Sequence, residues 1–254
     1  MASAGRAAFP LWATLALIAA GSWALTVSQA GTMGAGPGTM GMAFLFFMGM
    51  WVAMMAAMML PAIGPLAATE TAVAHPGAGG FRIPRGIAFA AGFLIPWAAY
   101  GALAFLALLG TERLVEASPD TAKWLGVGIF AVAGLYQLLP WKLRALLHCR
   151  MPMSRGRRDG RMGDLEAGVR DGAVCVGCCW AFMAILIAVG VMNVFAMVGL
   201  AVVIFAEKVL PRPRLIAALA GAAFLVFAAL AAVNPSLLPG LHDAGMTMQQ
   251  MGGM

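Results

Sequence analysis

The chain has few charged residues. Of its 254 residues, 10% are charged and 62% are hydrophobic, and the mean hydropathy is +0.90. A soluble domain of this length cannot bury so much apolar surface. The composition therefore excludes an ordinary soluble domain and predicts a polytopic membrane protein.

The motifs of several common enzyme classes are also missing. The sequence has no glycine-rich phosphate loop that ends in lysine and no HExxH zinc motif. It also has no serine, histidine and aspartate set in a supporting context. We therefore expect neither hydrolysis nor a nucleotide-driven activity.

Apolar runs fill most of the chain, which we treat as one integral membrane domain, 1–254. A bilayer crossing takes about 20 apolar residues, so each run is long enough for one transmembrane helix. We expect about seven spans, at residues 9–28, 42–62, 86–110, 123–141, 173–190, 193–210 and 214–233. Open sheets do not occur in lipid and the runs are too long for barrel strands, so the predicted fold class is an all-α transmembrane bundle. Six spans remain if the first is a cleaved secretory signal.

Basic residues are distributed unevenly between the two sides that seven spans create. With the N-terminus inside, fourteen of the sixteen lysines and arginines lie on the inner side, eight of them in the segment 142–172. Only Arg113 and Lys123 lie outside. Cytoplasmic loops show this bias, so we expect a bacterial inner-membrane protein with a cytoplasmic N-terminus and an exterior C-terminus. The net charge of +6 then faces anionic lipid headgroups and indicates no nucleic-acid partner.

The apolar stretch from Cys175 to Pro211 is too long for a single crossing. We expect it to form two helices joined by a tight turn near residues 190–193. Cys175 and Glu207 lie equally far from the centre of this turn, so both reach the same membrane surface. The hairpin therefore brings the cysteines to Glu207 and Lys208.

Three of the four cysteines lie within five positions. A CxxC spacing at a helix start lets two sulfur atoms point at one ion, as in zinc, copper and redox sites. An imidazole, a fourth thiol and a carboxylate on the same side extend this set. The candidate ligands are Cys175, Cys178, Cys179, Cys149, His148 and Glu207. The alternatives are thiols that pack as small apolar groups, an interfacial histidine, and a glutamate that pairs with Lys208.

Methionine is abundant, with 20 residues. In the second span, methionines at helical spacing form two adjacent stripes, and we interpret them as transient metal sites: Met50, Met54, Met55, Met58 and Met59. The alternative is flexible core packing. More methionines lie in the segment 234–254, which is expected to be an exterior tail, with a compositionally biased tail as the alternative. Thioether is a soft ligand that suits Cu(I).

The motif CVGCCWAFM at 175–183, followed by VMN at 191–193 and EKVLP at 207–211, resembles the signature of a bacterial family of predicted metal-binding integral membrane proteins of unknown function. The likeness extends to MGMWVAMMAAMMLP at 48–61, and to YQLLPWK and HCRMP within 136–152. It covers most of the chain. The resemblance implies metal binding and brings with it no reaction or transported substrate.

Three functions are compatible with these patterns. The first is a membrane protein that binds a soft transition metal, Cu(I) with zinc as the alternative, and exchanges it with a donor or acceptor protein in metal handling or transfer at the bilayer. The second is a membrane thiol oxidoreductase that uses Cys175 and Cys178 as a redox pair, although thiols facing a reducing cytoplasm argue against stable disulfides. The third is a non-catalytic subunit or assembly factor that docks through the basic segment 142–172.

Overall fold

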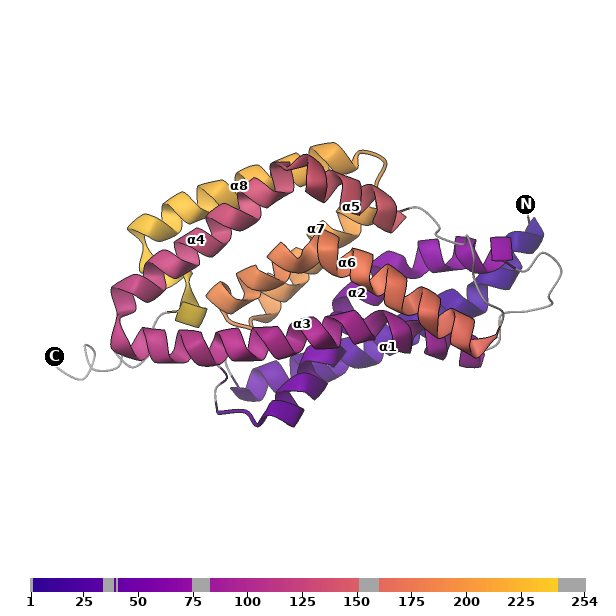
Figure 1. Ribbon diagram of the computed structural model, residues 1–254, viewed down its shortest axis with the longest axis horizontal. Coiled ribbons are helices and arrows are strands. Elements are labelled where there is room, and N and C mark those ends of the chain that lie inside the picture. The colour runs from indigo at the N-terminus through magenta and orange to yellow at the C-terminus, as the bar shows by residue number, and fades with distance from the viewer. Residues whose placement is uncertain (1, 34–38, 40, 75–82, 151–159, 242–254) are drawn as a thin grey trace.

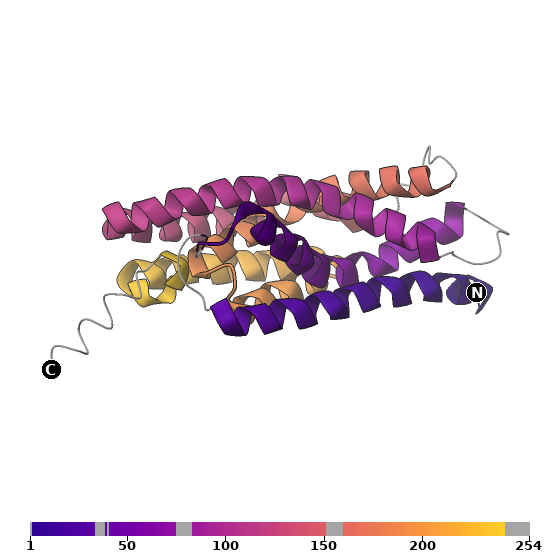
Figure 2. The same ribbon diagram turned by 90° about the horizontal axis from the view of Figure 1, so that it is seen from below.

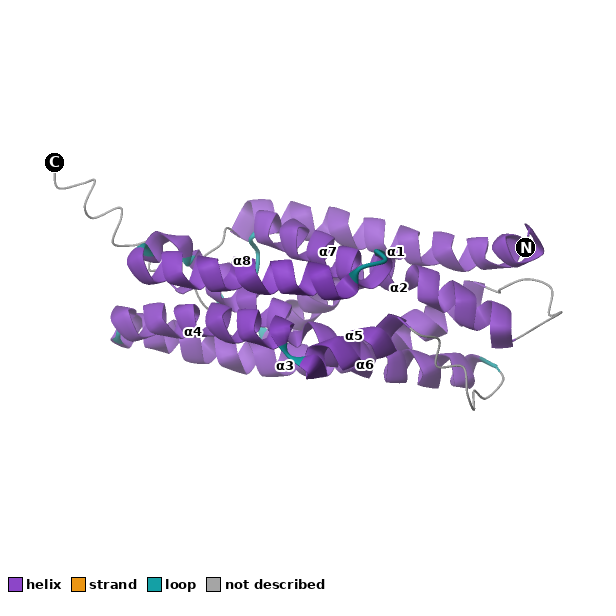
Figure 3. Cartoon of the chain, turned by 90° about the horizontal axis from the view of Figure 1, so that it is seen from above, coloured by secondary structure: helices purple, strands orange, loops and turns teal. Residues whose placement is uncertain are grey.

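The computed structural model describes residues 2–33, 39, 41–74, 83–150 and 160–241. Within these residues the chain forms α-helices and two short 3₁₀ helices, and no strand occurs (Figure 3). The elements are α1 (Ala2–Met33), α2 (Phe44–Ala74), α3 (Ile83–Ala117), α4 (Pro119–Leu138), α5 (Pro140–Arg150), α6 (Arg161–Val189), α7 (Val194–Val209), α8 (Pro213–Val233), η1 (Pro235–Leu237) and η2 (Pro239–Leu241). The predicted all-α fold class is confirmed.

Most helices lie roughly along the long axis of the molecule (Figures 1 and 2). The starts of α1, α3 and α6 lie at one end, on the right of Figure 1. The junction between α3 and α4 and the end of α8 lie at the opposite end. The first described residues and the last ones therefore lie at opposite ends of the bundle.

Five of the described helices are long and apolar enough to cross a membrane. Their apolar parts are Ala13–Ala30, Phe44–Gly64, Gly86–Val115, Arg161–Val189 and Pro213–Val233. A sixth crossing is obtained if α4 and α5, which meet at an angle of 67°, form one broken span. The 16 residues of α7 extend over about 24 Å, less than the roughly 30 Å of a hydrocarbon core. The protein is thus a multi-pass helical membrane protein with five or six candidate spans, close to the expected seven.

The segment around Pro140 differs from the expected fourth span, 123–141. Helix α4 ends at Leu138, and Leu139 is extended, with ψ of 142°. A residue before proline is driven out of the helical region, and proline favours the first position of a new helix. The chain therefore turns into α5, and the basic segment 142–172 contains most of α5 and the beginning of α6. Residues 151–159 of that segment lie outside the described residues, as do residues 242–254 of the expected tail.

Helices α3 and α6 approach each other through glycine. A Cβ atom at Gly168 would overlap the carbonyl oxygen of Phe89, and one at Gly92 would overlap that of Leu165. Small residues let helix backbones touch in this way in membrane bundles. The contact fixes the helix that carries Cys175 against α3.

The predicted hairpin is confirmed at its turn. Helix α6 ends at Val189 and α7 begins at Val194. Gly190 has a φ of 93°, a conformation that glycine adopts without strain. The Asn193 side chain accepts a hydrogen bond of 3.1 Å from the Ala196 amide and so caps α7.

Candidate metal centre

Three thiols meet inside the bundle. The Sγ atoms of Cys149, Cys175 and Cys178 all lie within 4.8 Å of one another. All three residues are buried, and their thiols are free. A buried group of three thiols is a donor set for a soft metal ion. We call these three residues the thiol cluster.

Helix geometry explains how two members of the thiol cluster come together. Cys175 and Cys178 are three residues apart on α6, so they share one face of the helix. The Cys178 thiol donates to the Cys175 carbonyl oxygen at 3.3 Å. Cys179 is buried beside them, with its Sγ 3.2 Å from that of Cys178, but it does not belong to the mutually close group of three.

The bend at Pro140 positions the third thiol, that of Cys149. On α5 the buried residues are Lys142, Leu146 and Cys149, which lie on one helical face. This face contacts α6 and α7. Without the 67° bend, α5 would continue the direction of α4, so the break in the chain is what brings Cys149 to α6.

The five predicted methionines of α2 are all buried, and one of them reaches the thiol cluster. The Met59 sulfur lies 3.9 Å from Cys175 Sγ. Met50, Met54, Met55 and Met58 lie elsewhere along the buried part of α2. The structure therefore brings together thiols and one thioether from three helices.

Lys208 contacts the thiol cluster directly. Its Nζ donates to Cys175 Sγ at 2.9 Å, and only 7% of its surface is exposed. The hairpin register predicted this proximity. The candidate ligand on α7 in the sequence analysis was, however, the neighbouring residue, Glu207.

Glu207 belongs to a separate polar group. Its carboxylate accepts from Lys142 Nζ at 2.6 Å and from Gln137 Nε2 at 2.7 Å. The Lys142 ammonium also lies 4.8 Å from the centre of the Phe182 ring. Since both carboxylate oxygens are engaged, the structure does not bring Glu207 into the thiol cluster. We call Lys142, Glu207 and Gln137 the ion-pair group.

Arg150 joins α5 to the end of α7. Its Nη1 donates to the Glu207 carbonyl oxygen at 2.6 Å and to the Leu210 carbonyl oxygen at 2.8 Å. These carbonyls belong to the last turn of a helix, where backbone acceptors lack helical partners. Arg150 satisfies them and holds its neighbour Cys149 in place.

His148 is not part of the thiol cluster. Its side chain is exposed, and Nδ1 lies 2.8 Å from the Arg144 carbonyl oxygen one turn earlier. Cys149 and His148 are adjacent in sequence but lie on different faces of α5, because consecutive residues on a helix are about 100° apart.

Two tyrosines brace the part of α6 that carries the cysteines. Tyr136 of α4 donates to the Gly177 carbonyl oxygen at 2.5 Å, and Tyr100 of α3 donates to the Trp180 carbonyl oxygen at 3.0 Å. The Tyr136 and Trp180 rings also pack with centroids 5.1 Å apart. The α6 backbone around the thiols is thus supported from both sides.

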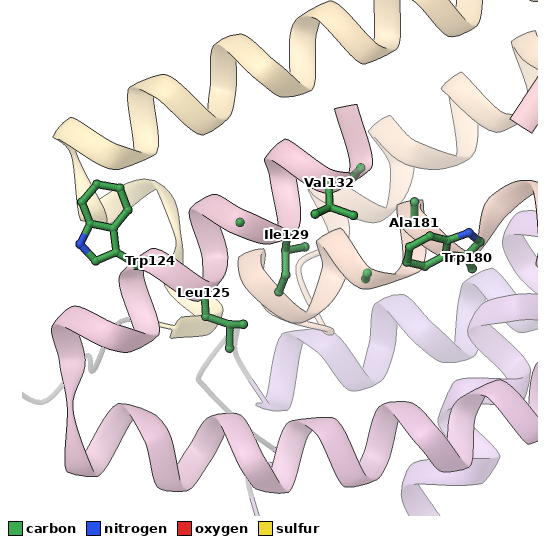
Figure 4. A pocket seen from close by; sticks show the side chains of 9 residues that line it. Trp124, Leu125, Ile129, Val132, Trp180 and Ala181 are labelled. Carbon is green, nitrogen blue, oxygen red and sulfur yellow. The ribbon is translucent and has the colours of Figure 1, made fainter. Parts of the chain in front are cut away.

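An apolar cavity of about 390 Å³ lies between α4 and α6, next to this bracing (Figure 4). Trp124, Leu125, Ile129 and Val132 of α4 line it, and Trp180 and Ala181 of α6 complete it. These residues offer no thiol, carboxylate or imidazole. The cavity is therefore no part of the donor set.

Sequence reasoning missed three polar residues around the thiols, namely Lys142, Gln137 and Arg150, and it gave Lys208 no role beyond pairing with Glu207. One signal was available: Lys142 and Gln137 lie in YQLLPWK, and Lys208 lies in EKVLP, the motifs that carry the family resemblance. Polar side chains at the edge of apolar runs are costly in membranes unless they have partners. Arg150 lies in HCRMP, another of these motifs.

The chain matches a known protein family over most of its length. Residues 48–231 match the model of the family described as PpoB2, copper chaperone. This range includes every residue of the thiol cluster and of the ion-pair group. Comparisons with curated proteins and with solved structures gave no match. Since the match covers well over half of the chain, the protein belongs to the PpoB2 copper chaperone family.

Proposed function

We propose that this protein binds Cu(I) at the thiol cluster and hands it to an acceptor, across or along the bacterial inner membrane. The observation that carries the proposal is the convergence of Cys149, Cys175 and Cys178, whose Sγ atoms lie within 4.8 Å of one another. The family description, copper chaperone, supports the same ion.

The donor atoms favour Cu(I) over the alternative, zinc. Thiolate and thioether sulfur are soft ligands that select Cu(I). Structural zinc sites use four ligands from cysteine, histidine or carboxylate side chains. Here Cys149, Cys175 and Cys178 are mutually close, and the nearest further donors are also sulfur: Cys179 Sγ lies 3.2 Å from Cys178 Sγ, and the Met59 sulfur lies 3.9 Å from Cys175 Sγ. His148 and Glu207 are engaged elsewhere.

The methionines of α2 supply a route for transfer in this proposal. Met55 lies one helical turn from Met59, while Met58, Met54 and Met50 succeed one another at one-turn intervals. All five are buried along α2. An ion released from the thiols would meet a thioether at each turn towards the start of the helix. The N-terminus is assigned to the cytoplasm on the charge bias, so this route leads outward.

Copper content tests the proposal. The full-length protein, purified under reducing conditions and loaded with Cu(I), is expected to retain stoichiometric copper against a competing chelator. Replacing Cys149, Cys175 and Cys178 together by serine is expected to abolish that copper, because the three thiolates are the main ligands. The measurement is elemental analysis after desalting.

Cys179→Ser is the matched control, since Cys179 is equally buried but outside the group of three. It is expected to keep its copper. Copper retained by the triple variant, or zinc retained in preference to copper by the unaltered protein, would refute the proposal. A Cys175–Cys178 disulfide trapped from cells would instead support the thiol oxidoreductase.

A further inference from the structure

We propose that Lys208 is the internal counter-ion of the thiol cluster and sets its preference for a monovalent over a divalent ion. This inference rests on the proposed function, because it concerns the ion held by the same three thiols. It assigns Lys208 a positioning role and not that of a ligand.

The first step is the burial of Lys208. An ammonium group removed from water requires a compensating partner, since an unpaired buried charge is strongly unfavourable. Its neighbour Glu207 is the obvious candidate, yet that carboxylate is held by Lys142 and Gln137. Among the described residues, the Lys208 ammonium donates to Cys175 Sγ at 2.9 Å.

The second step is what surrounds that ammonium. All four cysteine thiols are close enough to interact with it electrostatically. Lys208 thus faces sulfur, while the other buried lysine, Lys142, faces carboxylate. The Lys208 ammonium therefore borders the proposed metal site.

The third step is charge balance. Cysteine binds metal as thiolate. Three thiolates around Cu(I) carry two net negative charges, whereas three thiolates around a divalent ion carry one. Because Coulomb energy scales with the product of charges, a fixed cation stabilises the Cu(I) complex about twice as strongly in free energy. An N–H donor to a metal-bound sulfur adds the outer-shell support that metal sites generally use.

The test compares two ions in one pair of proteins. Both proteins carry Cys179→Ala, so that Cu(I) and Cd(II) meet the same three thiols, and one of them also carries Lys208→Met. Cu(I) affinity is measured by competition with bathocuproine disulfonate, and Cd(II) affinity by its thiolate charge-transfer absorption in competition with a chelator. Lys208→Met is expected to weaken Cu(I) at least about tenfold more than Cd(II), because the Cu(I) complex carries one more negative charge and the metal-free site is the same for both ions.

Two further variants separate charge from structure. Lys208→Arg keeps a cation and is expected to hold the ratio of the two affinities near that of the parent. Arg212→Gln removes an exposed cation four residues away and is expected to change neither affinity. A structural defect would lower both affinities alike and would not be reversed selectively by arginine.

The outcomes are distinct from those of the proposed function. Equal losses for the two ions, or no loss in Lys208→Met, would overturn the role of Lys208 while leaving copper binding intact. A parent protein that binds no Cu(I) would instead refute the proposed function, together with what rests on it.

Discussion

Glu207 and Lys208 are consecutive residues of α7, yet they belong to different polar groups. Glu207 completes an ion pair with Lys142 and a hydrogen bond with Gln137. Lys208 donates to Cys175 in the thiol cluster. Adjacent residues on a helix point about 100° apart, so one helical turn serves two buried groups.

The two groups differ in whether they are complete. In the ion-pair group, a cation and an anion balance each other at 2.6 Å, which is the arrangement expected of a buried charge that holds helices together. In the thiol cluster, a cation faces groups that become charged when they bind metal. The first group therefore supports the fold, and the second is the one that we propose receives an ion.

The largest effect on this comparison is expected in stability, when one half of the ion pair is removed. Lys142→Met leaves the Glu207 carboxylate buried without its cation, and we expect a loss of about 3–5 kcal/mol in stability. Thermal unfolding in detergent measures the loss.

The double variant Lys142→Met with Glu207→Gln is the control for this first test. The glutamine oxygen still accepts from Gln137 and no charge remains in the ion-pair group, so most of the stability should return. A double variant as unstable as the single one would show that Lys142 acts through packing. The double variant is also expected to retain copper, because neither residue touches the thiol cluster.

A smaller effect is expected for Arg150, which supports both the ion-pair group and the thiol cluster. Arg150 donates to the Glu207 carbonyl oxygen and adjoins Cys149 in sequence. Arg150→Met removes the contacts that hold the end of α5. Maleimide is then expected to label Cys149 several-fold faster in the metal-free protein, with little change at Cys175, as read by mass spectrometry.

Arg144→Met is the matched variant, because Arg144 is an exposed arginine of the same helix. Its labelling rate should equal that of the unaltered protein. Unchanged labelling in Arg150→Met would mean that the apolar contacts of α5 suffice to hold Cys149.

The smallest effect concerns the boundary of the thiol cluster. His148 is exposed and its Nδ1 lies near the Arg144 carbonyl oxygen, so His148→Ala is expected to change Cu(I) affinity by no more than about 0.5 kcal/mol. Chelator competition measures it. A tenfold loss of Cu(I) affinity would mean that the His148 imidazole is a ligand and that the metal site includes it.

Much of the fold could be predicted because its causes are local. Apolar runs of bilayer length specify helices, and Gly190 with Asn193 specifies the turn of the hairpin. The 67° bend at Pro140 was not predicted, since proline is compatible with both a kinked helix and a new one. Which of these forms depends on what the next segment packs against.

The site was harder to predict than the fold. The CxxC spacing specified that Cys175 and Cys178 share a face, and the hairpin register brought α7 to them. The sequence did not reveal which of Cys149 and His148 points inward, because that depends on the rotation of α5 about its own axis. Nor did it reveal that Glu207 would form an ion pair with Lys142, because these residues are 65 positions apart in the sequence.

The glycine contact between α3 and α6 has a consequence for how an ion leaves. Gly92 and Gly168 lie directly against the backbone of the opposite helix, so Cys175 and Cys178 stand on a helix that is closely packed against α3. Cys149 lies on the short helix α5, which follows the 67° bend, and the Arg150 guanidinium holds the end of that helix. If the three thiols hold an ion as we propose, the ligand on α5 would be the one expected to open first, and the other two would remain together on α6.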